Sequence, residues 1–359
     1  MQRAGLGLFL ALGLALLPAC STLGYYAQAA RGQLDLLTLR QPLAQVLADE
    51  TTPAETRRLL GRAQAMRRFA VEALGLPDNA SYSSYADLKR THVVWNVVAT
   101  PEFSLEPIQS CFLLIGCLNY RGYFSEAQAQ AQADALRVQG YDVIVSGSAA
   151  YSTLGWFEDP LLSTMLRWDE ARLAAVMFHE LAHQKLYLPG DSDFNESFAS
   201  VVEEVGARRW LSQHASAEAL AAWETERLRQ RQFTELVAGA RSRLQRLYAT
   251  SVNDADKRRA KVEIFRDLQQ KYAELKQSWQ GHTGYDRWFA ELNNAKVAAV
   301  STYHAGVPAL RHLLGALDED LQRFYRAAEN IAAWPAPRRQ RWLAEGGEAA
   351  VSDFSASVR

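Results

Sequence analysis

LAAVMFHELAHQKLYLPGDSDFNESFASVVEEVGARRW, residues 173–210, is the stretch around which the chain is organised. It contains HELAH, a match to H-E-x-x-H in an apolar segment that has no helix breaker before Pro189. On a helix, the spacing of four residues stacks His179 and His183 on one face, where both can bind one zinc ion. Glu180 lies beside this pair, where its carboxylate can take a proton from a metal-bound water. The motif therefore predicts the zinc site of a hydrolase.

A catalytic zinc ion normally has three protein ligands, so a third one is expected. Glu196 is the best candidate, because Pro189 and Gly190 end the first helix and Glu196 opens a second apolar segment. A helix-loop-helix can return this glutamate to the histidine pair. An alternative stays open, in which Asp193 caps the second helix and Glu196 is the N3 glutamate of a capping box.

Glu203 follows Glu196 by seven residues on the same helical face, and Glu204 comes next. Either carboxylate is a candidate to orient a histidine from outside the ligand shell, or to be the ligand itself. The alternative is that both lie on a solvated surface.

The N-terminus has the layout of a secretory signal, 1–19. Its one charge, Arg3, precedes an apolar run of twelve residues, Leu6 to Leu17. LPAC, which ends at Cys20, resembles the lipobox of bacterial lipoproteins, in which the cysteine becomes the lipidated first residue. The alternative, an uncleaved anchor helix, is disfavoured because twelve residues are short for a bilayer. Ser21 in place of an aspartate implies sorting to the outer membrane, so we expect a soluble periplasmic body tethered by lipid.

Charge and length set further bounds on the 359-residue chain. It has 39 Lys and Arg against 40 Asp and Glu, and loss of residues 1–19 removes only Arg3, which leaves a net charge of −2. This balance gives no electrostatic reason to expect a nucleic-acid partner. The length suits one large domain or two closely packed ones, and it sets no oligomeric state.

Cys111 and Cys117 are the cysteines that remain if Cys20 carries lipid. In an oxidising compartment they predict a disulfide that closes a short loop. Two free buried thiols are the alternative. A second metal site there lacks partners, because no histidine lies nearby in the sequence.

The remaining pattern predicts an α+β fold that is predominantly helical, with a small mixed or antiparallel sheet. We expect helix over 24–76 and from Ser125 to about 138, strands over 92–98 and 141–146, a helical hairpin over about 216–280 that turns near Asn253, and a flexible tail over 336–359. The domain would then span 20–335.

Residues 148–162 precede the predicted helix that contains HELAH, and we expect an extended segment near 151–157. In thermolysin-like zinc peptidases, the strand beside this helix is a sheet edge that holds the substrate backbone by strand addition. Gly155 would allow such a close approach. An ordinary hairpin under the helix explains the pattern equally well. Glu158 and Asp159, beside this piece, are guesses for groups that bind a substrate's free N-terminus.

A hydrogen-bond donor for the developing oxyanion is a further expectation for a zinc peptidase. Within 293–314 the helical periodicity resumes, and Tyr303 and His304 lie just before a break at Gly306. Tyr303 is the first candidate for this donor and His304 the second. The alternative is that Tyr303 is a packed aromatic residue and His304 a surface residue.

The segments HELAHQ, DFNESFA, YRGYF and NAKVAAVSTYH together resemble a bacterial family of predicted lipoprotein aminopeptidases. The resemblance covers most of the mature chain and is most specific in HELAH and NESFA. It implies a zincin-like core in which His179, His183 and Glu196 bind one zinc ion and Glu180 is the base, as in the glutamate-zincins.

The spacing departs from the broader glutamate-zincin group. Only twelve residues separate His183 from Glu196, and Ser200 stands where an acidic residue is usual, four positions after the glutamate. The carboxylate that supports the ligands must therefore come from a neighbouring position, and the candidates are Asp191, Asp193, Glu203 and Glu204.

Together these features predict a zinc metallopeptidase that acts on peptides. The alternative from another class is a non-catalytic envelope lipoprotein, in which the zinc or the helix pair alone has a structural role.

Overall fold

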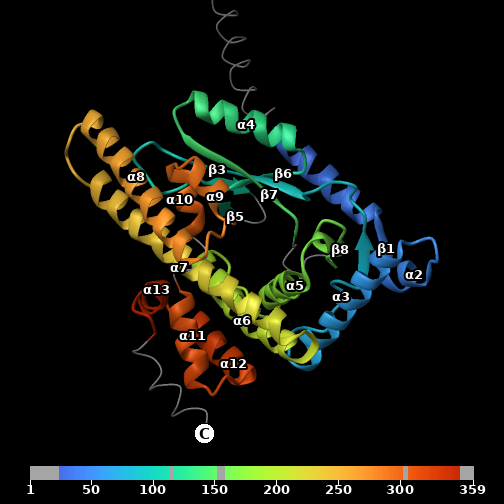
Figure 1. Cartoon of the computed structure of the whole chain (residues 1–359). Helices are drawn as coiled ribbons and strands as arrows, with labels where there is room; N and C mark the ends of the chain where they lie inside the picture. Colours follow the sequence, from blue (N-terminus) through green and yellow to red (C-terminus); the bar gives the residue numbers. More distant parts are fainter. Residues whose placement is uncertain (1–23, 113–115, 152–157, 302–305, 348–359) are drawn as a thin grey trace, which may run out of the picture.

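A computed structural model describes residues 24–112, 116–151, 158–301 and 306–347. The predictions for Cys20, Gly155, Tyr303 and His304 concern residues outside these ranges. The structure is 63% helix and 9% strand, with small sheets of two or three strands. The predicted α+β, predominantly helical class is therefore confirmed (Figure 1).

The N-terminal part is helical but interrupted. Residues 24–38 are helical, and β1 (Arg40–Pro42), α2 (Leu43–Ala48) and α3 (Ala54–Glu72) follow. The prediction of helix throughout 24–76 is therefore wrong between these elements. Pro42 and Pro53 occupy the N-caps of α2 and α3. Because proline lacks an N–H and clashes with the preceding turn, it begins a helix here instead of continuing one.

The described strands include two three-stranded sheets. One has the order β6 (Arg121–Tyr123), β3 (Val94–Thr100), β7 (Asp142–Ser148) and is antiparallel; the other has the order β1, β2 (Ser84–Ala86), β8 (Leu161–Leu162) and is mixed. The predicted strands thus correspond to β3 and β7. Helix α4 (Glu126–Val138) covers the antiparallel sheet, and Ser125 caps it as predicted (Figure 1).

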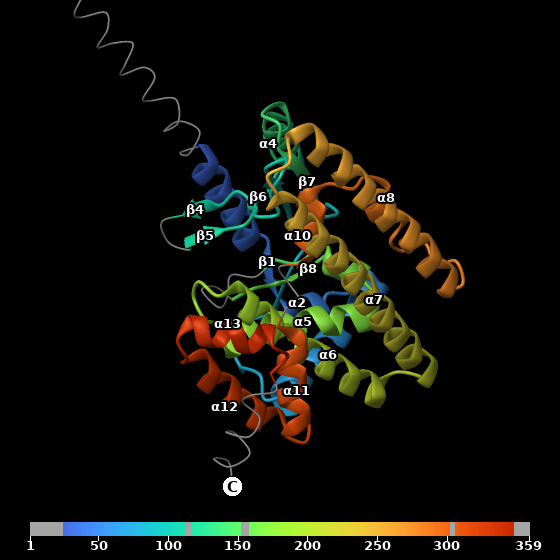
Figure 2. The ribbon, with the colours of Figure 1, turned by 90° about the vertical axis from the view of Figure 1, so that its left-hand side faces the viewer.

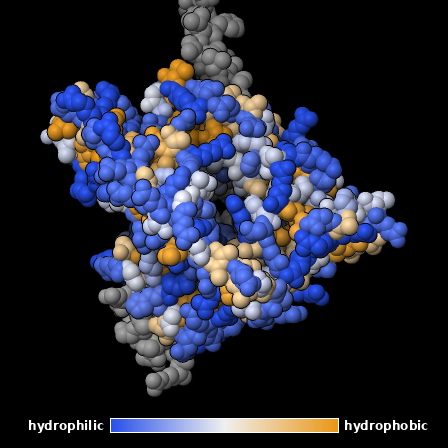
Figure 3. Space-filling view, viewed as in Figure 1, coloured by the Kyte–Doolittle hydropathy of each residue, from blue (hydrophilic) through white to orange (hydrophobic). Residues whose placement is uncertain are grey.

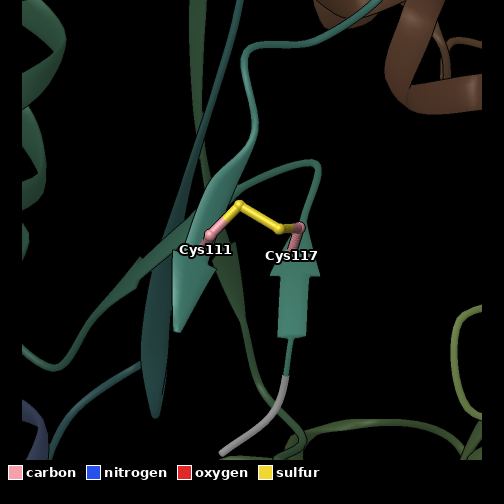
Figure 4. The surroundings of a disulfide bond; sticks show 2 residues. All are labelled: Cys111 and Cys117. Atoms are coloured by element: carbon pink, nitrogen blue, oxygen red, sulfur yellow. A yellow bond between two sulfur atoms is a disulfide. The ribbon is translucent and has the colours of Figure 1, made fainter. Parts of the chain in front are cut away.

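A disulfide joins Cys111 and Cys117 across the hairpin of β4 (Ser110–Phe112) and β5 (Gly116–Leu118) (Figure 4). The two residues are direct cross-strand partners, with Cα atoms 3.9 Å apart. The predicted disulfide is therefore present, and the alternative of two free thiols is wrong. The bond holds the strand that leads directly into Tyr120 and β6.

The core is built on the helix pair α5 (Glu170–Lys185) and α6 (Ser192–His214), which pack closely against each other. Phe178 on α5 and Phe198 and Val202 on α6 have no exposed surface. Burial of such a side chain contributes about 1.5–3 kcal/mol. The pair is therefore a rigid support for the polar residues that it carries.

The predicted helical hairpin is present as α7 (Ala217–Tyr248) and α8 (Asp254–Ser278), which run side by side (Figure 2). Ser216 caps α7 and Asn253 caps α8 at the predicted turn. The hairpin has its own apolar cluster, which includes Phe233, Leu244 and Leu268.

Short helices complete the chain: η1 (Met165–Arg167), α9 (Asp286–Ala290), α10 (Asn294–Ser301), α11 (Val307–Ala316), α12 (Leu321–Ala332) and α13 (Ala336–Ala344). The predicted flexible tail is wrong for 336–344, because Arg339, Trp342 and Leu343 of α13 are buried. Residues 348–359 lie outside the described ranges. Among the described helices, none is long and apolar enough to cross a membrane.

Candidate metal centre

His179 and His183 project from the same face of α5. Their Nε2 atoms lie 3.1 Å apart, and their rings are nearly perpendicular, at 84°. This is the consequence of four-residue spacing on a helix, as the sequence predicts. The two nitrogens that could bind a common ion therefore converge on one point.

Glu196 reaches the same point from α6. Its Oε2 lies 3.3 Å from His179 Nε2, and its Oε1 lies 3.7 Å from His183 Nε2. The N-cap of α6 is Asp191, whose side chain accepts a hydrogen bond from the backbone N–H of Phe194. The capping-box alternative, with Asp193 as the cap, is therefore wrong, because Glu196 is the fifth residue of the helix and not the third.

These three side chains form a set that fits zinc. Among the described residues, one ligand atom from each lies within 4.8 Å of the other two. Two zinc–nitrogen bonds of about 2.0–2.1 Å at a tetrahedral angle separate the nitrogens by about 3.3 Å, close to the spacing of the histidine nitrogens. Two imidazoles and one carboxylate are also the donor set of many catalytic zinc sites.

The protonation of the two histidines differs. Burial lowers the pKa of His179, but hydrogen bonds to Glu196 and Glu203 outweigh it and leave the pKa well above its ordinary value. Burial and then the charge on His179 lower the pKa of His183 to about 4. In this pair the neutral form is thus favoured at His183 and the charged form at His179, and a metal ion binds the neutral imidazole.

Glu203 supports His179 from behind. Its Oε2 lies 3.0 Å from His179 Nδ1, so the carboxylate can accept the Nδ1 proton and leave Nε2 free for a metal. Arg227 on α7 binds the other oxygen of Glu203, at 3.0 Å. The long hairpin is thus connected to the candidate metal centre through Arg227.

The other predicted supporting carboxylates have different partners. Glu204 pairs with Arg231 and Arg311. Asp191 pairs with Arg339, and Asp193 is exposed. Among the described residues, no contact joins any of these carboxylates to a histidine. The reason is geometric, since 100° of helical rotation separates Glu204 from Glu203.

Glu180 is partly buried on α5, next to His179. Burial and then the negative charge of Glu180 raise the pKa of Tyr82, and the same charge adds to the raised pKa values of His179 and Tyr120. The carboxylate therefore acts on the same small region as the three candidate ligands.

Tyr120 was missed by the sequence analysis, although it is the first residue of YRGYF. Burial and then the charges of Glu196 and Glu180 raise its pKa to about 12. Its hydroxyl is therefore protonated at neutral pH, and both carboxylates act on it electrostatically. Tyr187, also missed, has its ring centroid 6.3 Å from that of His183.

The two candidates for an amine-binding group, Glu158 and Asp159, differ in exposure. Asp159 is only 2% exposed, and Glu158 is exposed, with its backbone carbonyl bound by Arg40.

The face in Figure 3 is hollowed near its centre, between the antiparallel sheet and α5. Most of the predicted substrate strand lies outside the described residues.

Replacement of Glu203 by alanine is expected to lower zinc affinity by about 10- to 100-fold, because His179 loses the carboxylate that fixes its ring and tautomer. Competition with a fluorescent chelator measures the affinity. Glu204→Ala is the matched control, since the neighbouring carboxylate pairs with Arg231 and Arg311. Equal zinc affinity in wild type and Glu203→Ala would show that Glu203 has no supporting role.

Comparison with known proteins gives one match. A family model described as "Putative aminopeptidase" matches residues 24–343, which include all three candidate ligands and α13 up to Leu343. No curated protein and no solved structure matches.

Proposed function

The chain belongs to the family described as "Putative aminopeptidase", and on this premise we propose that it is a zinc-dependent peptidase with Glu180 as its general base. The observation that carries the proposal is the convergence of His179, His183 and Glu196 on one point, with ligand atoms within 4.8 Å. The adjacent carboxylate of Glu180 and the hydroxyl of Tyr120 supply the other groups that peptide hydrolysis needs.

His179, His183 and Glu196 would hold a zinc ion, which would supply Lewis acidity to activate water and polarise the scissile carbonyl. Glu180 accepts the proton of the attacking water and then delivers it to the leaving amine. Glu203 keeps His179 in the tautomer that presents Nε2 to the ion.

Tyr120 is the proposed donor of a hydrogen bond to the oxyanion, beside the earlier candidates Tyr303 and His304. Tyr120→Phe is expected to lower kcat by about 10²–10³-fold, because one donor to the developing charge is lost. Steady-state kinetics on a peptide substrate measure the effect.

The control for this variant is Tyr141→Phe, at a partly buried tyrosine that packs against the sheet cluster. Zinc content should equal that of wild type in both variants. Unchanged kcat in Tyr120→Phe would exclude Tyr120 as the donor and leave Tyr303 and His304 as the candidates.

Digestion of a broad peptide library, with the termini of the products sequenced, tests the reaction itself. Release of single N-terminal residues identifies an aminopeptidase, whereas internal cleavage identifies an endopeptidase. A protein that binds zinc but cleaves no peptide in the library would instead be the non-catalytic envelope lipoprotein, and the proposal would be wrong.

We also propose that Cys20 carries lipid and anchors the protein on the periplasmic side of the outer membrane. The support is the LPAC sequence after an apolar run. Cys20→Ala should move the protein from the membrane fraction to the soluble periplasmic fraction, and retention in the membrane fraction would contradict the anchor.

A further inference from the structure

An ion pair between Arg339 on α13 and Asp191 joins the C-terminal end of the fold to the start of α6. Arg339 Nε and Nη2 both donate to Asp191 Oδ2, at 2.7 and 2.6 Å. Both side chains are buried, with 5% and 7% of their surface exposed. Charges so far from water persist only when they are well paired, so this contact fixes two elements that are distant in the sequence.

Arg339 is itself held firmly. Its Nη1 donates to the backbone carbonyls of Ala332 and Trp334, at 3.1 and 2.7 Å. These carbonyls lie at the end of α12 and just beyond it. The guanidinium is therefore a fixed point and not a mobile surface side chain.

The two oxygens of the Asp191 carboxylate bind different partners. Oδ1 accepts the N–H of Phe194 and caps α6, while Oδ2 binds Arg339. Asn195 closes the same turn, because its side chain exchanges two hydrogen bonds with the backbone of Leu188. The first turn of α6 is thus held from the loop side and from α13.

Glu196 follows Asn195 directly, so the orientation of this turn sets the position of its carboxylate. A second link lies beside it, where the backbone N–H of Gly306 donates to Ser197 Oγ at 3.2 Å. Leu343 of α13 packs against Gly306 so closely that a Cβ there would meet its Cδ2 at 2.7 Å. Two contacts from the C-terminal region therefore flank Glu196.

We propose that α13 is part of the support of the metal centre, with Arg339 as a positioning residue that holds Glu196 in place through Asp191. The inference rests on the proposed function, because it assumes that Glu196 binds zinc. It assigns to the C-terminal helix a role in metal affinity, where the sequence predicted a flexible tail.

Zinc affinity of the full mature protein tests the inference. Arg339→Met should bind zinc about 10- to 100-fold more weakly, as is typical when the support of a ligand is lost. Arg341→Met, an exposed arginine on the same helix, should bind zinc as wild type does. The Co²⁺-substituted protein gives a second readout, since a displaced Glu196 changes the visible absorption of tetrahedral cobalt.

Leu268→Ala tests whether Arg339→Met weakens zinc binding only because it destabilises the fold. This substitution removes a buried side chain from the distant hairpin cluster. If this variant loses as much thermal stability as Arg339→Met yet keeps its zinc affinity, the loss at Arg339 is specific. Equal losses of affinity in the two variants would overturn the inference.

If Arg339→Met does not fold, conservative variants still test the role of Arg339. Arg339→Lys retains the charge but loses the fork that reaches the two carbonyls, so its zinc affinity should lie between those of wild type and Arg339→Met. Asp191→Asn retains the cap but loses the charge, and its loss of affinity should not add to that of Arg339→Lys in the double variant. Fully additive losses would show that the two residues act separately.

Failure of the proposed function gives a different result. A wild-type protein that binds no zinc overturns both proposals, whereas wild-type binding with unaffected Arg339 variants overturns only the inference about α13.

Discussion

Glu180→Gln should lose about 10³–10⁴-fold in kcat while it keeps one zinc ion and its fold. Glutamine has nearly the shape of glutamate but cannot accept the proton of the attacking water, and general base catalysis is worth about 10²–10⁴-fold. We place the loss at the upper end because the same carboxylate also returns the proton to the leaving amine. Single-turnover kinetics on a cleaved library peptide measure the chemical step directly.

Retention of zinc by Glu180→Gln would show that its loss of kcat does not come from loss of the metal. Glu180 is not one of the three candidate ligands, so elemental analysis should give the wild-type zinc content. Glu235→Gln, at an exposed glutamate of the hairpin, is the matched control and should leave kcat unchanged. Full activity in Glu180→Gln would remove Glu180 from the mechanism, even if zinc is required.

His183→Ala should abolish both zinc binding and peptide cleavage. His183 is the most buried of the three candidate ligands, at 5% exposure, and without it only His179 and Glu196 remain. A site with two protein ligands lacks the donor number of catalytic zinc sites. Zinc content should fall well below one per chain, and activity should fall to the background of the uncatalysed reaction.

Two controls define the outcome for His183. His312→Ala, at an exposed histidine on α11, should keep both zinc and activity. Removal of zinc from wild type with a chelator should reproduce the loss, and added zinc should restore activity only in wild type. Equal zinc content in His183→Ala and wild type would show that the ion binds elsewhere.

The features that the sequence predicts well depend on local geometry. The four-residue spacing in HELAH places His179 and His183 together on any α-helix, whatever the rest of the fold. Ser125 caps α4 as predicted, and Ser216 and Asn253 cap α7 and α8 at the predicted start and turn of the hairpin. A cap needs only the side chain and the N–H groups two or three residues later.

The errors arise where distant segments meet. Residues 336–344 were predicted to be a flexible tail because they follow Pro335 and precede a Gly and Ala-rich end. They form a helix whose Arg339 finds its partner 148 positions earlier in the chain. No pattern within α13 reveals that partner, since the pairing depends on how α12 and α13 pack beside α6.

The sequence by itself determined the helix pair, the two histidines, the adjacent glutamate and the hairpin, because each follows from periodicity, capping or spacing over a few residues. Only the tertiary structure decided that Glu203 and not Glu204 contacts His179, that Asp191 pairs with Arg339, and that the charges of Glu196 and Glu180 act on Tyr120. The physical reason is that these choices depend on the rotation of α6 against α5 and on chain segments that packing brings together. The stretch 173–210 thus carries the candidate ligands, while the residues that hold them in place come from the whole fold.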